Sequence, residues 1–210
     1  HKEYRRQRQM CIRDSLLDRI KKQLSESSLE PRSTAYRRWL TTKISNLQVT
    51  RQALLQDKER LRNTTFIGRM YFYYYDPKLK DMLPYYDRFP LVIPIEQHSD
   101  GFLGLNLHYI NPKQRIILLD KLSEFANNSA YDATTKLRLS YAMLKQASKV
   151  YEKKPCLKKY LYKHIDSRFL EISADEWDIA ALLPVESFIG ASSNKVWACL
   201  LYTSPSPRDA

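Results

Sequence analysis

The stretch Phe66–Tyr75 reads FIGRMYFYYY and is followed by Asp76 and Pro77, a pair typical of turns. Aromatic residues favour strands, so we expect an extended segment here. Successive side chains of a strand point to opposite faces, and therefore at least one set of these rings should be buried.

Two more extended segments follow this stretch. Leu91–Ile95 (LVIPI) and Phe102–Tyr109 (FLGLNLHY) flank a turn at Ser99–Gly101. Together the three segments predict an antiparallel meander. Pro90 and Pro94 cannot donate hydrogen bonds to a neighbouring strand, so the LVIPI segment should be an edge strand or a bulged strand.

A helical arm is expected before the sheet. Apolar residues at helical spacing predict one helix over Leu16–Leu29, stopped by Pro31, and a second from Ser33 or Thr34 to about Arg62. Its single apolar stripe should pack on its own domain, on a copy of itself or on a partner. An ordinary amphipathic helix with a solvated basic face has the same pattern. The basic residues opposite the stripe are Arg37, Arg38, Lys43, Arg51, Lys58, Arg60 and Arg62.

Helices dominate the rest of the chain. Spacing and capping residues predict helices over Asn111–Ala126, after Asp132 and after Pro155. A strand over Arg168–Ile172 and a short helix opened by the capping box Ser173–Glu176 follow. The sequence therefore predicts an α+β fold: an N-terminal helical arm, a small antiparallel aromatic-rich sheet and a C-terminal helical cluster.

Both ends of the chain resemble translated sequencing adapter. The runs are Arg5–Ser15 (RRQRQMCIRDS) and Cys199–Ala210 (CLLYTSPSPRDA), so we expect residues 1–15 and 199–210 not to be native. The arm then occupies residues 16–62 and an α+β core domain occupies residues 66–198.

Without these ends, 29 basic and 20 acidic side chains leave a net charge of +9, against +12 for the full chain. Only Cys156 remains among the cysteines, which excludes an intrachain disulfide and favours an inert thiol in a reducing compartment. No apolar run approaches the roughly 20 residues of a membrane span, so no membrane contact is expected.

The strongest charge feature lies between residues 145 and 168, where Glu152 and Asp166 are the only acids. A helix after Pro155 would carry these cations on an outer face, interleaved with Tyr160 and Tyr162. Such a face suits a phosphate backbone, although a solvated lysine-rich face has the same composition. The candidate DNA-binding residues are Lys145, Lys149, Lys153, Lys154, Lys158, Lys159, Lys163 and Arg168.

The tyrosine-rich part of the sheet has two interpretations. Its rings could stack on the bases of a single strand. A stacking groove needs cations beside its rings, however, and lysine and arginine are sparse here. We therefore favour a core or interface role for Tyr71, Tyr73, Tyr74, Tyr75, Tyr85 and Tyr86.

The sequence gives little support to catalysis. Asp87 with Glu96 is a weak match to the Asp…Glu-x-Lys metal site of restriction-type nucleases, because His98 stands where the lysine belongs and prolines interrupt the strand. His108 and His164 have no partner at metal-ligand spacing and are expected to be structural. No phosphate loop, serine elbow or zinc ligand set occurs, so we expect no enzyme activity, no metal and no cofactor.

Four segments together resemble a family of small virion proteins of contractile-tailed phages, described as DNA end protector proteins. The resemblance spans about 130 residues and rests on MYFYYYDPKLKDMLPYYDRFPLVIPIE (70–96), DGFLGLNLHYINPKQRIILLDKL (100–122), PCLKKYLYKHIDSRFLEI (155–172) and DEWDIAALLPVESF (175–188). It implies a virion protein near the head–tail junction that binds the ends of the packaged double-stranded DNA and shields them from host exonuclease. It implies no catalytic residue and no cofactor.

Three hypotheses follow. The first is this DNA-end-binding protein, present in the host cytoplasm during assembly and then in the virion. The second is a neck, baseplate or head-completion protein that binds other phage head or tail proteins, or copies of itself. The third is a metal-dependent nuclease that uses Glu96.

Overall fold

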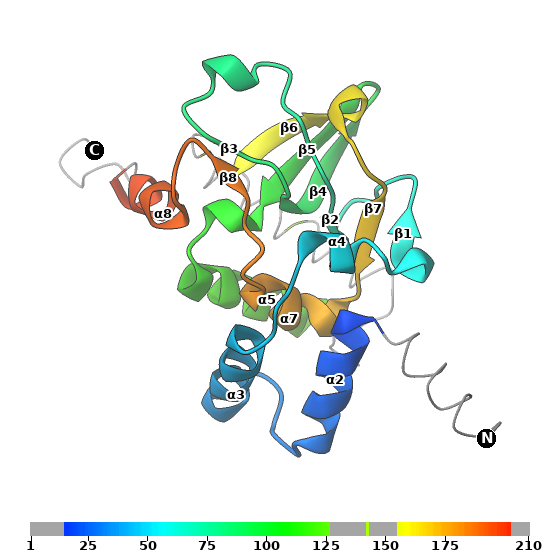
Figure 1. Ribbon diagram of the computed structural model, residues 1–210, viewed down its shortest axis with the longest axis vertical. Coiled ribbons are helices and arrows are strands. Elements are labelled where there is room, and N and C mark those ends of the chain that lie inside the picture. The colour runs from blue at the N-terminus through cyan, green and yellow to red at the C-terminus, as the bar shows by residue number, and fades with distance from the viewer. Residues whose placement is uncertain (1–14, 127–141, 143–154, 203–210) are drawn as a thin grey trace.

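The computed structural model describes residues 15–126, 142 and 155–202, and it confirms an α+β fold with an antiparallel sheet (Figure 1). The sheet has six strands, and every neighbouring pair is antiparallel. Across the sheet the strands are β1 (Leu61–Arg62), β7 (Phe169–Ile172), β2 (Met70–Phe72), β4 (Leu91–His98), β5 (Gly101–Asn106) and β6 (Leu157–Leu161). A second, two-stranded sheet pairs β3 (Tyr86–Asp87) with β8 (Phe188–Ile189).

The expected meander is confirmed as β2, β4 and β5, which lie side by side in the sheet. The edge alternative for the LVIPI segment is wrong, because β4 lies between β2 and β5. The bulge alternative is confirmed, since the register with β5 shifts between Pro94 and Glu96. Proline has no backbone N–H to donate, and the bulge accommodates this in an inner strand. The carbonyl oxygen of Pro94 accepts a hydrogen bond of 2.9 Å from the backbone N–H of Gly68.

One face of the sheet is built from aromatic rings, as the alternation predicts. Tyr73 lies at its centre, with its ring centroid 5.1 to 6.4 Å from those of four neighbouring rings, mostly edge to face. This geometry suits aromatic pairs and fills the space above the strands. The buried members are Tyr71, Tyr73, Tyr75, Val92, Phe102, Tyr160 and Phe169. The core interpretation is confirmed for Tyr71, Tyr73 and Tyr75, whereas Tyr74 and Tyr85 are half-buried against the other face.

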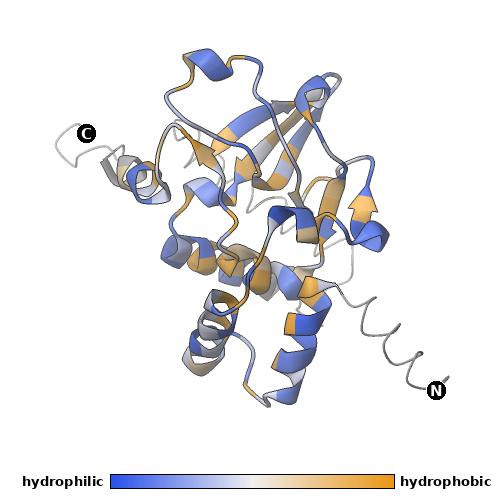
Figure 2. Ribbon diagram, in the orientation of Figure 1, coloured by the Kyte–Doolittle hydropathy of each residue, from blue (hydrophilic) through white to orange (hydrophobic). Residues whose placement is uncertain are grey.

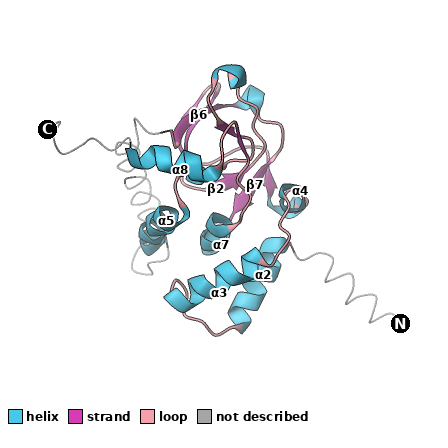
Figure 3. Cartoon of the chain, turned by 60° about the vertical axis from the view of Figure 1, so that its left-hand side comes forward, coloured by secondary structure: helices cyan, strands magenta, loops and turns pink. Residues whose placement is uncertain are grey.

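The other face of the sheet is mostly aliphatic and is covered by two layers of helices (Figure 3). The inner layer holds α5 (Pro112–Ala126) and α7 (Trp177–Leu182), and the outer layer holds α2 (Leu16–Glu26) and α3 (Thr34–Ser45). Figure 2 shows hydrophobic residues gathered on the strands and the inner helices, whereas α2 is mostly hydrophilic. The predicted helix over residues 112–126 is confirmed, and Asn111 caps it by accepting from the N–H of Gln114.

The predicted capping box is also confirmed. Ser173 and Glu176 bond each other's backbone at the start of a 3₁₀ turn that leads into α7. The predicted helix after Asp132 lies outside the described residues. The helix α8 (Ser193–Tyr202) was not predicted. Within the described part of the chain, no helix has both the length and the apolar character that crossing a membrane requires.

The second arm helix is shorter than predicted. It ends at Ser45, and the chain then forms α4 (Arg51–Leu54), a 3₁₀ turn and β1, so the prediction of one helix to about Arg62 is wrong. Thr50 starts the new helix because its side chain accepts from the N–H of Ala53. Leu61, part of the predicted stripe, instead pairs with Leu170 of β7. Local capping at Thr50 and sheet pairing at Leu61 therefore determine this segment, although its apolar residues are spaced as in one helix.

Candidate nucleic-acid interface

The leucine spacing after Pro155 predicts a helix, and this prediction is wrong because residues 157–161 form β6. The strand pairs with β5 along its whole length and stands at one end of the sheet order. Gly101 of β5 permits the close approach, since a Cβ there would lie 2.0 Å from the carbonyl oxygen of Tyr160. Pairing with a distant strand decides this segment, whose apolar spacing also fits a helix.

The strand separates cations that a helix would have placed together. Lys158 and Lys159 point to opposite sides of β6, because side chains alternate along a strand. Lys159 and Lys163 are exposed, and Lys159 forms a surface ion pair of 2.8 Å with Asp100. Arg168 is exposed too, but its guanidinium donates to the side-chain oxygen of Asn63 at 3.0 Å and to the carbonyl oxygen of Leu61 in β1 at 2.7 Å. The candidates Lys145, Lys149, Lys153 and Lys154 lie outside the described residues.

A cavity of about 320 Å³ lies between β6 and the segment Pro77–Tyr86. This segment, which contains a 3₁₀ turn, arches over β6 in Figure 1. The aromatic walls are Tyr75, Tyr86, Tyr109 and Tyr160, and the cations are Lys78, Lys158 and Lys159. Among the lining residues the only acid is Asp87. We call this cavity the tyrosine–lysine pocket.

Lys158 is the least solvated of the pocket's cations. Its amine lies 4.6 Å from the centre of the Tyr109 ring, a cation–π contact, and it forms no ion pair with a carboxylate of the described residues. Burial lowers the pKa of Lys158, and the negative charge of Asp87 only partly opposes this. An anion bound beside Lys158 would therefore offset the desolvation of its ammonium group.

Three tyrosines in or near the pocket have buried hydroxyls. The hydroxyl of Tyr73 has no hydrogen-bond partner within the described part of the chain, whereas Tyr109 interacts with the backbone of Asp87 and Tyr160 with the side chain of Asn106. Burial raises the pKa of all three side chains, and the nearby charge of Asp87 raises it further. Buried polar atoms without partners are rare. The rings of Tyr109 and Tyr160 line the cavity.

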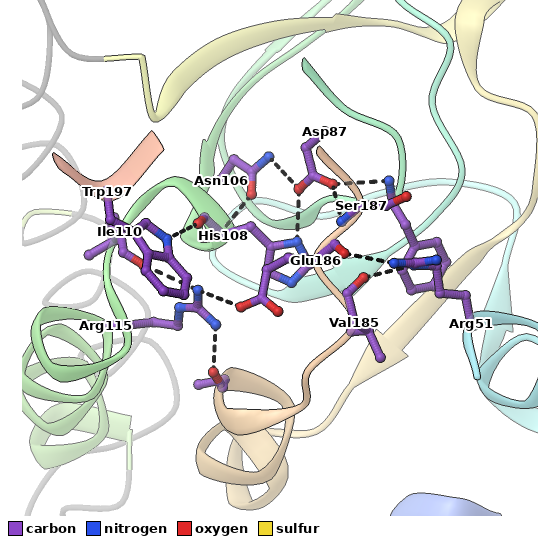
Figure 4. A network of polar contacts seen from close by, with 12 residues as sticks. Arg51, Asp87, Asn106, His108, Ile110, Arg115, Val185, Glu186, Ser187 and Trp197 are labelled. Atoms are coloured by element: carbon purple, nitrogen blue, oxygen red, sulfur yellow. Dashed lines mark hydrogen bonds and ion pairs between the residues drawn. The ribbon is translucent and has the colours of Figure 1, made fainter. Parts of the chain in front are cut away.

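Behind these hydroxyls, Asp87 anchors a buried polar network (Figure 4). Its carboxylate lies 2.8 Å from Nδ1 of His108 and accepts from the Asn106 amide at 3.2 Å. Backbone N–H groups of Phe89 and Ser187 donate to its other oxygen at 3.1 and 3.3 Å. Although burial raises the pKa of Asp87, His108 and these donors bring it below its ordinary value. Asp87 therefore connects β3 to the end of β5 through Asn106 and His108, and its role is structural.

The same network extends through Arg115 on α5. This arginine is fully buried and donates to the carbonyl oxygens of Ala181 and Ile110 at 2.6 and 3.1 Å and to Glu186 at 3.0 Å. The indole of Trp197 donates 2.8 Å to the carbonyl oxygen of His108. Sequence reasoning missed these partners. The available signal was that Asp87, His108 and Arg115 stand among apolar neighbours, where an unpaired charge would be costly.

The structure does not assemble the weak nuclease motif. Asp87 is bonded to Asn106, which pairs with Val92, whereas Glu96 pairs with Leu103 four positions further along β4. At roughly 3.3 Å per residue, Glu96 lies about 13 Å along β4 from the residue that pairs with the partner of Asp87. The Glu96 side chain is 61% exposed. Among the described residues, no group of three or more histidine, cysteine or acidic side chains could hold a metal ion.

The remaining candidates have structural surroundings. His108 is buried and bonded to Asp87, as expected for a structural histidine. The carbonyl oxygen of His164 accepts from the N–H of Asp76 at 2.9 Å. Cys156 is fully buried, and it precedes a strand rather than starting a helix.

Fold and site together define a small α+β protein with an aromatic cavity that carries lysines, a combination suited to ligands that contain phosphate. The family model described as phage T4 terminal DNA protecting protein matches residues 1–200, and the chain belongs to this family. The match spans all four segments that carry the resemblance. No curated protein and no solved structure matches the chain.

Proposed function

We propose that this protein binds the ends of the packaged linear double-stranded DNA of a phage and shields them from exonuclease. The family match over residues 1–200 carries the proposal. The tyrosine–lysine pocket and the exposed Lys163 support it, because binding to phosphate requires lysine or arginine side chains that can contact it. A protector of ends needs phosphate contacts and a geometry that recognises a terminus, and neither needs reaction chemistry.

The proposed location is the virion, near the head–tail junction, after synthesis and assembly in the host cytoplasm. A protein that protects an ejected end has to accompany that end out of the particle. The junction is where the leading end of packaged DNA waits, so a protein bound there meets the end before any exonuclease does.

The proposed DNA contact surface includes Lys159 and Lys163, whose ammonium groups face solvent. The ion pair between Lys159 and Asp100 does not prevent this role, since exposed pairs contribute roughly 0 to 1 kcal/mol and exchange partners readily. Lys145, Lys149, Lys153 and Lys154 stay in the proposal on sequence grounds, as does Arg168.

A charge-matched pair of variants tests this surface. Lys159→Gln with Lys163→Gln should weaken binding to linear DNA and reduce the slope of log affinity against log salt by about 2, because each lost phosphate contact removes roughly 0.9 from the slope. Lys113→Gln with Lys195→Gln removes the same charge from exposed positions on α5 and α8. Equal affinities and slopes for the two double variants would remove Lys159 and Lys163 from the interface.

One observation favours a second function, docking to other head or tail proteins. The segment over β6 exposes three apolar side chains, Leu79 (56%), Met82 (79%) and Leu83 (37%). Exposed apolar groups that gather in one place mark contact surfaces. A neck, baseplate or head-completion role predicts no DNA affinity near physiological salt, and binding to linear DNA there would exclude it as the whole explanation.

A further inference from the structure

We infer that the tyrosine–lysine pocket receives the terminal nucleotide of a DNA strand, with the base against the tyrosine-lined wall and the 5′-phosphate at the lysines. The inference rests on the proposed function and assigns the end-recognition step to one cavity. Exposed lysines such as Lys163 attract any DNA, and the pocket, whose lining includes the exposed Lys159, selects a terminus.

Size and walls fit this occupant. The cavity of about 320 Å³ lies at the lower end of the range for ligand pockets, roughly 300 to 1,000 Å³, and suits one nucleotide rather than a length of strand. Tyr75, Tyr109 and Tyr160 of the lining are buried, whereas Tyr86 is half-buried and has the most ring surface free to contact a base. Stacking on such rings tolerates any base, as a protein that binds genome ends requires.

The lysines supply the phosphate site. Lys78 and Lys158 line the cavity, and neither forms an ion pair with a carboxylate of the described residues. The carboxylate of Asp87, the acid among the lining residues, accepts from His108 and three further donors and forms no ion pair with either lysine. Lys78 and Lys158 are therefore open to a phosphate, whose oxygens can accept charge-assisted hydrogen bonds.

A terminus enters such a cavity more easily than an internal nucleotide. An internal nucleotide is stacked on both sides and must be flipped out at a cost of a few kcal/mol, whereas a terminal one has lost a stacking neighbour. The rim assists, because the exposed Leu79 and Leu83 can cover apolar surface of the base that leaves the stack. The pocket thus separates ends from interior by geometry and by the cost of unstacking.

The test compares 5′-phosphorylated with 5′-hydroxyl ends of one blunt duplex. The wild-type protein should bind the phosphorylated end about tenfold more tightly, since hydrogen bonds to charged groups are the strong ones. Lys78→Gln with Lys158→Met should remove this tenfold preference. The charge-matched control, Lys113→Gln with Lys195→Gln, should keep it.

Two further measurements make the outcome independent of a folding defect. Leu83→Trp fills the mouth from a partly exposed position, and thermal melts check that both pocket variants fold. Deoxyadenosine monophosphate, followed by tyrosine fluorescence, should bind the wild-type protein and the lysine control and lose affinity at least tenfold in both pocket variants.

The results separate the pocket from the proposed function. If the folded pocket variants match the wild-type protein in phosphate preference and in nucleotide binding, the pocket inference is overturned while end protection stands. If the wild-type protein fails to protect linear DNA, the proposed function fails, and nucleotide binding alone then decides the pocket. Absence of that binding overturns it, and binding that the pocket variants lose retains it.

Discussion

Replacing Asp87 by asparagine should destabilise the protein strongly. The carboxylate accepts from His108, Asn106 and two backbone N–H groups at 2.8 to 3.3 Å, and its side chain is 1% exposed. Breaking one partner of a buried pair costs about 3 to 5 kcal/mol, because donors lose their acceptor and cannot reach water. For a chain of this size that corresponds to a fall in Tm of roughly 6 to 20 °C.

The assay is thermal and urea unfolding followed by circular dichroism, with Asp81→Asn as the matched control. Asp81 is exposed on the segment over β6, so its replacement should change stability by less than about 0.5 kcal/mol. A loss below about 1 kcal/mol for Asp87→Asn, or a loss equal to that of the control, would refute the account of the network.

The same variant predicts a pH dependence. The folded-state pKa of Asp87 lies below its ordinary value of 3.8, so its stabilisation is present above about pH 4 and is lost as the pH falls through the lowered pKa. The stability difference between the wild-type protein and Asp87→Asn should therefore be constant near neutral pH and should narrow below about pH 4. A difference that stays unchanged down to pH 2 would contradict the lowered pKa.

Two other predictions concern the β4–β5 hairpin and the nuclease hypothesis. Gly101→Ala should cost at least about 2 kcal/mol in urea unfolding, because the new Cβ would lie 2.0 Å from the Tyr160 carbonyl oxygen, whereas Ser99→Ala in the same hairpin should be nearly neutral. Linear DNA incubated with the protein and Mg²⁺ should stay uncut, and Glu96→Gln should behave identically; cleavage that this variant abolishes would revive the nuclease hypothesis.

Much of the fold follows from local sequence patterns. Period-two aromatics predict the buried face of β2, the turn at Ser99–Gly101 predicts the β4–β5 hairpin, and capping residues predict α5 and the start of α7. Each of these signals lies within a few residues of the element it specifies. Such short-range signals survive folding because tertiary contacts agree with them.

The errors concern segments that distant contacts decide. Residues 157–161 have apolar spacing that fits a helix, yet Gly101 leaves room for them as a strand. The predicted helix does not continue to Arg62, and its last residues instead form β1, where Leu61 pairs with Leu170 of β7, more than 100 positions away. The spacing of apolar residues within one segment does not show whether that segment pairs with a strand elsewhere in the chain.

The pocket was beyond sequence reasoning for the same reason. Asp87 and His108 are 21 positions apart and lie in different elements, and Lys158 joins them from a third. The sequence predicts the basic block as a candidate site, but the difference between the exposed Lys159 and Lys163 and the less exposed Lys158 depends on strand alternation. Only the pairing of β6 with β5 determines which lysine turns inward.

The most direct test of the central claim uses the full chain, titrated into linear blunt-ended DNA and into the same DNA closed as a circle, across a salt series. Exonuclease digestion is the readout for the linear form, and nitrocellulose filter binding compares the two forms. The account predicts salt-dependent binding that favours the linear form and protects it from digestion at protein concentrations that bind its ends. Equal binding to both forms with no protection, or no binding near physiological salt, would contradict it.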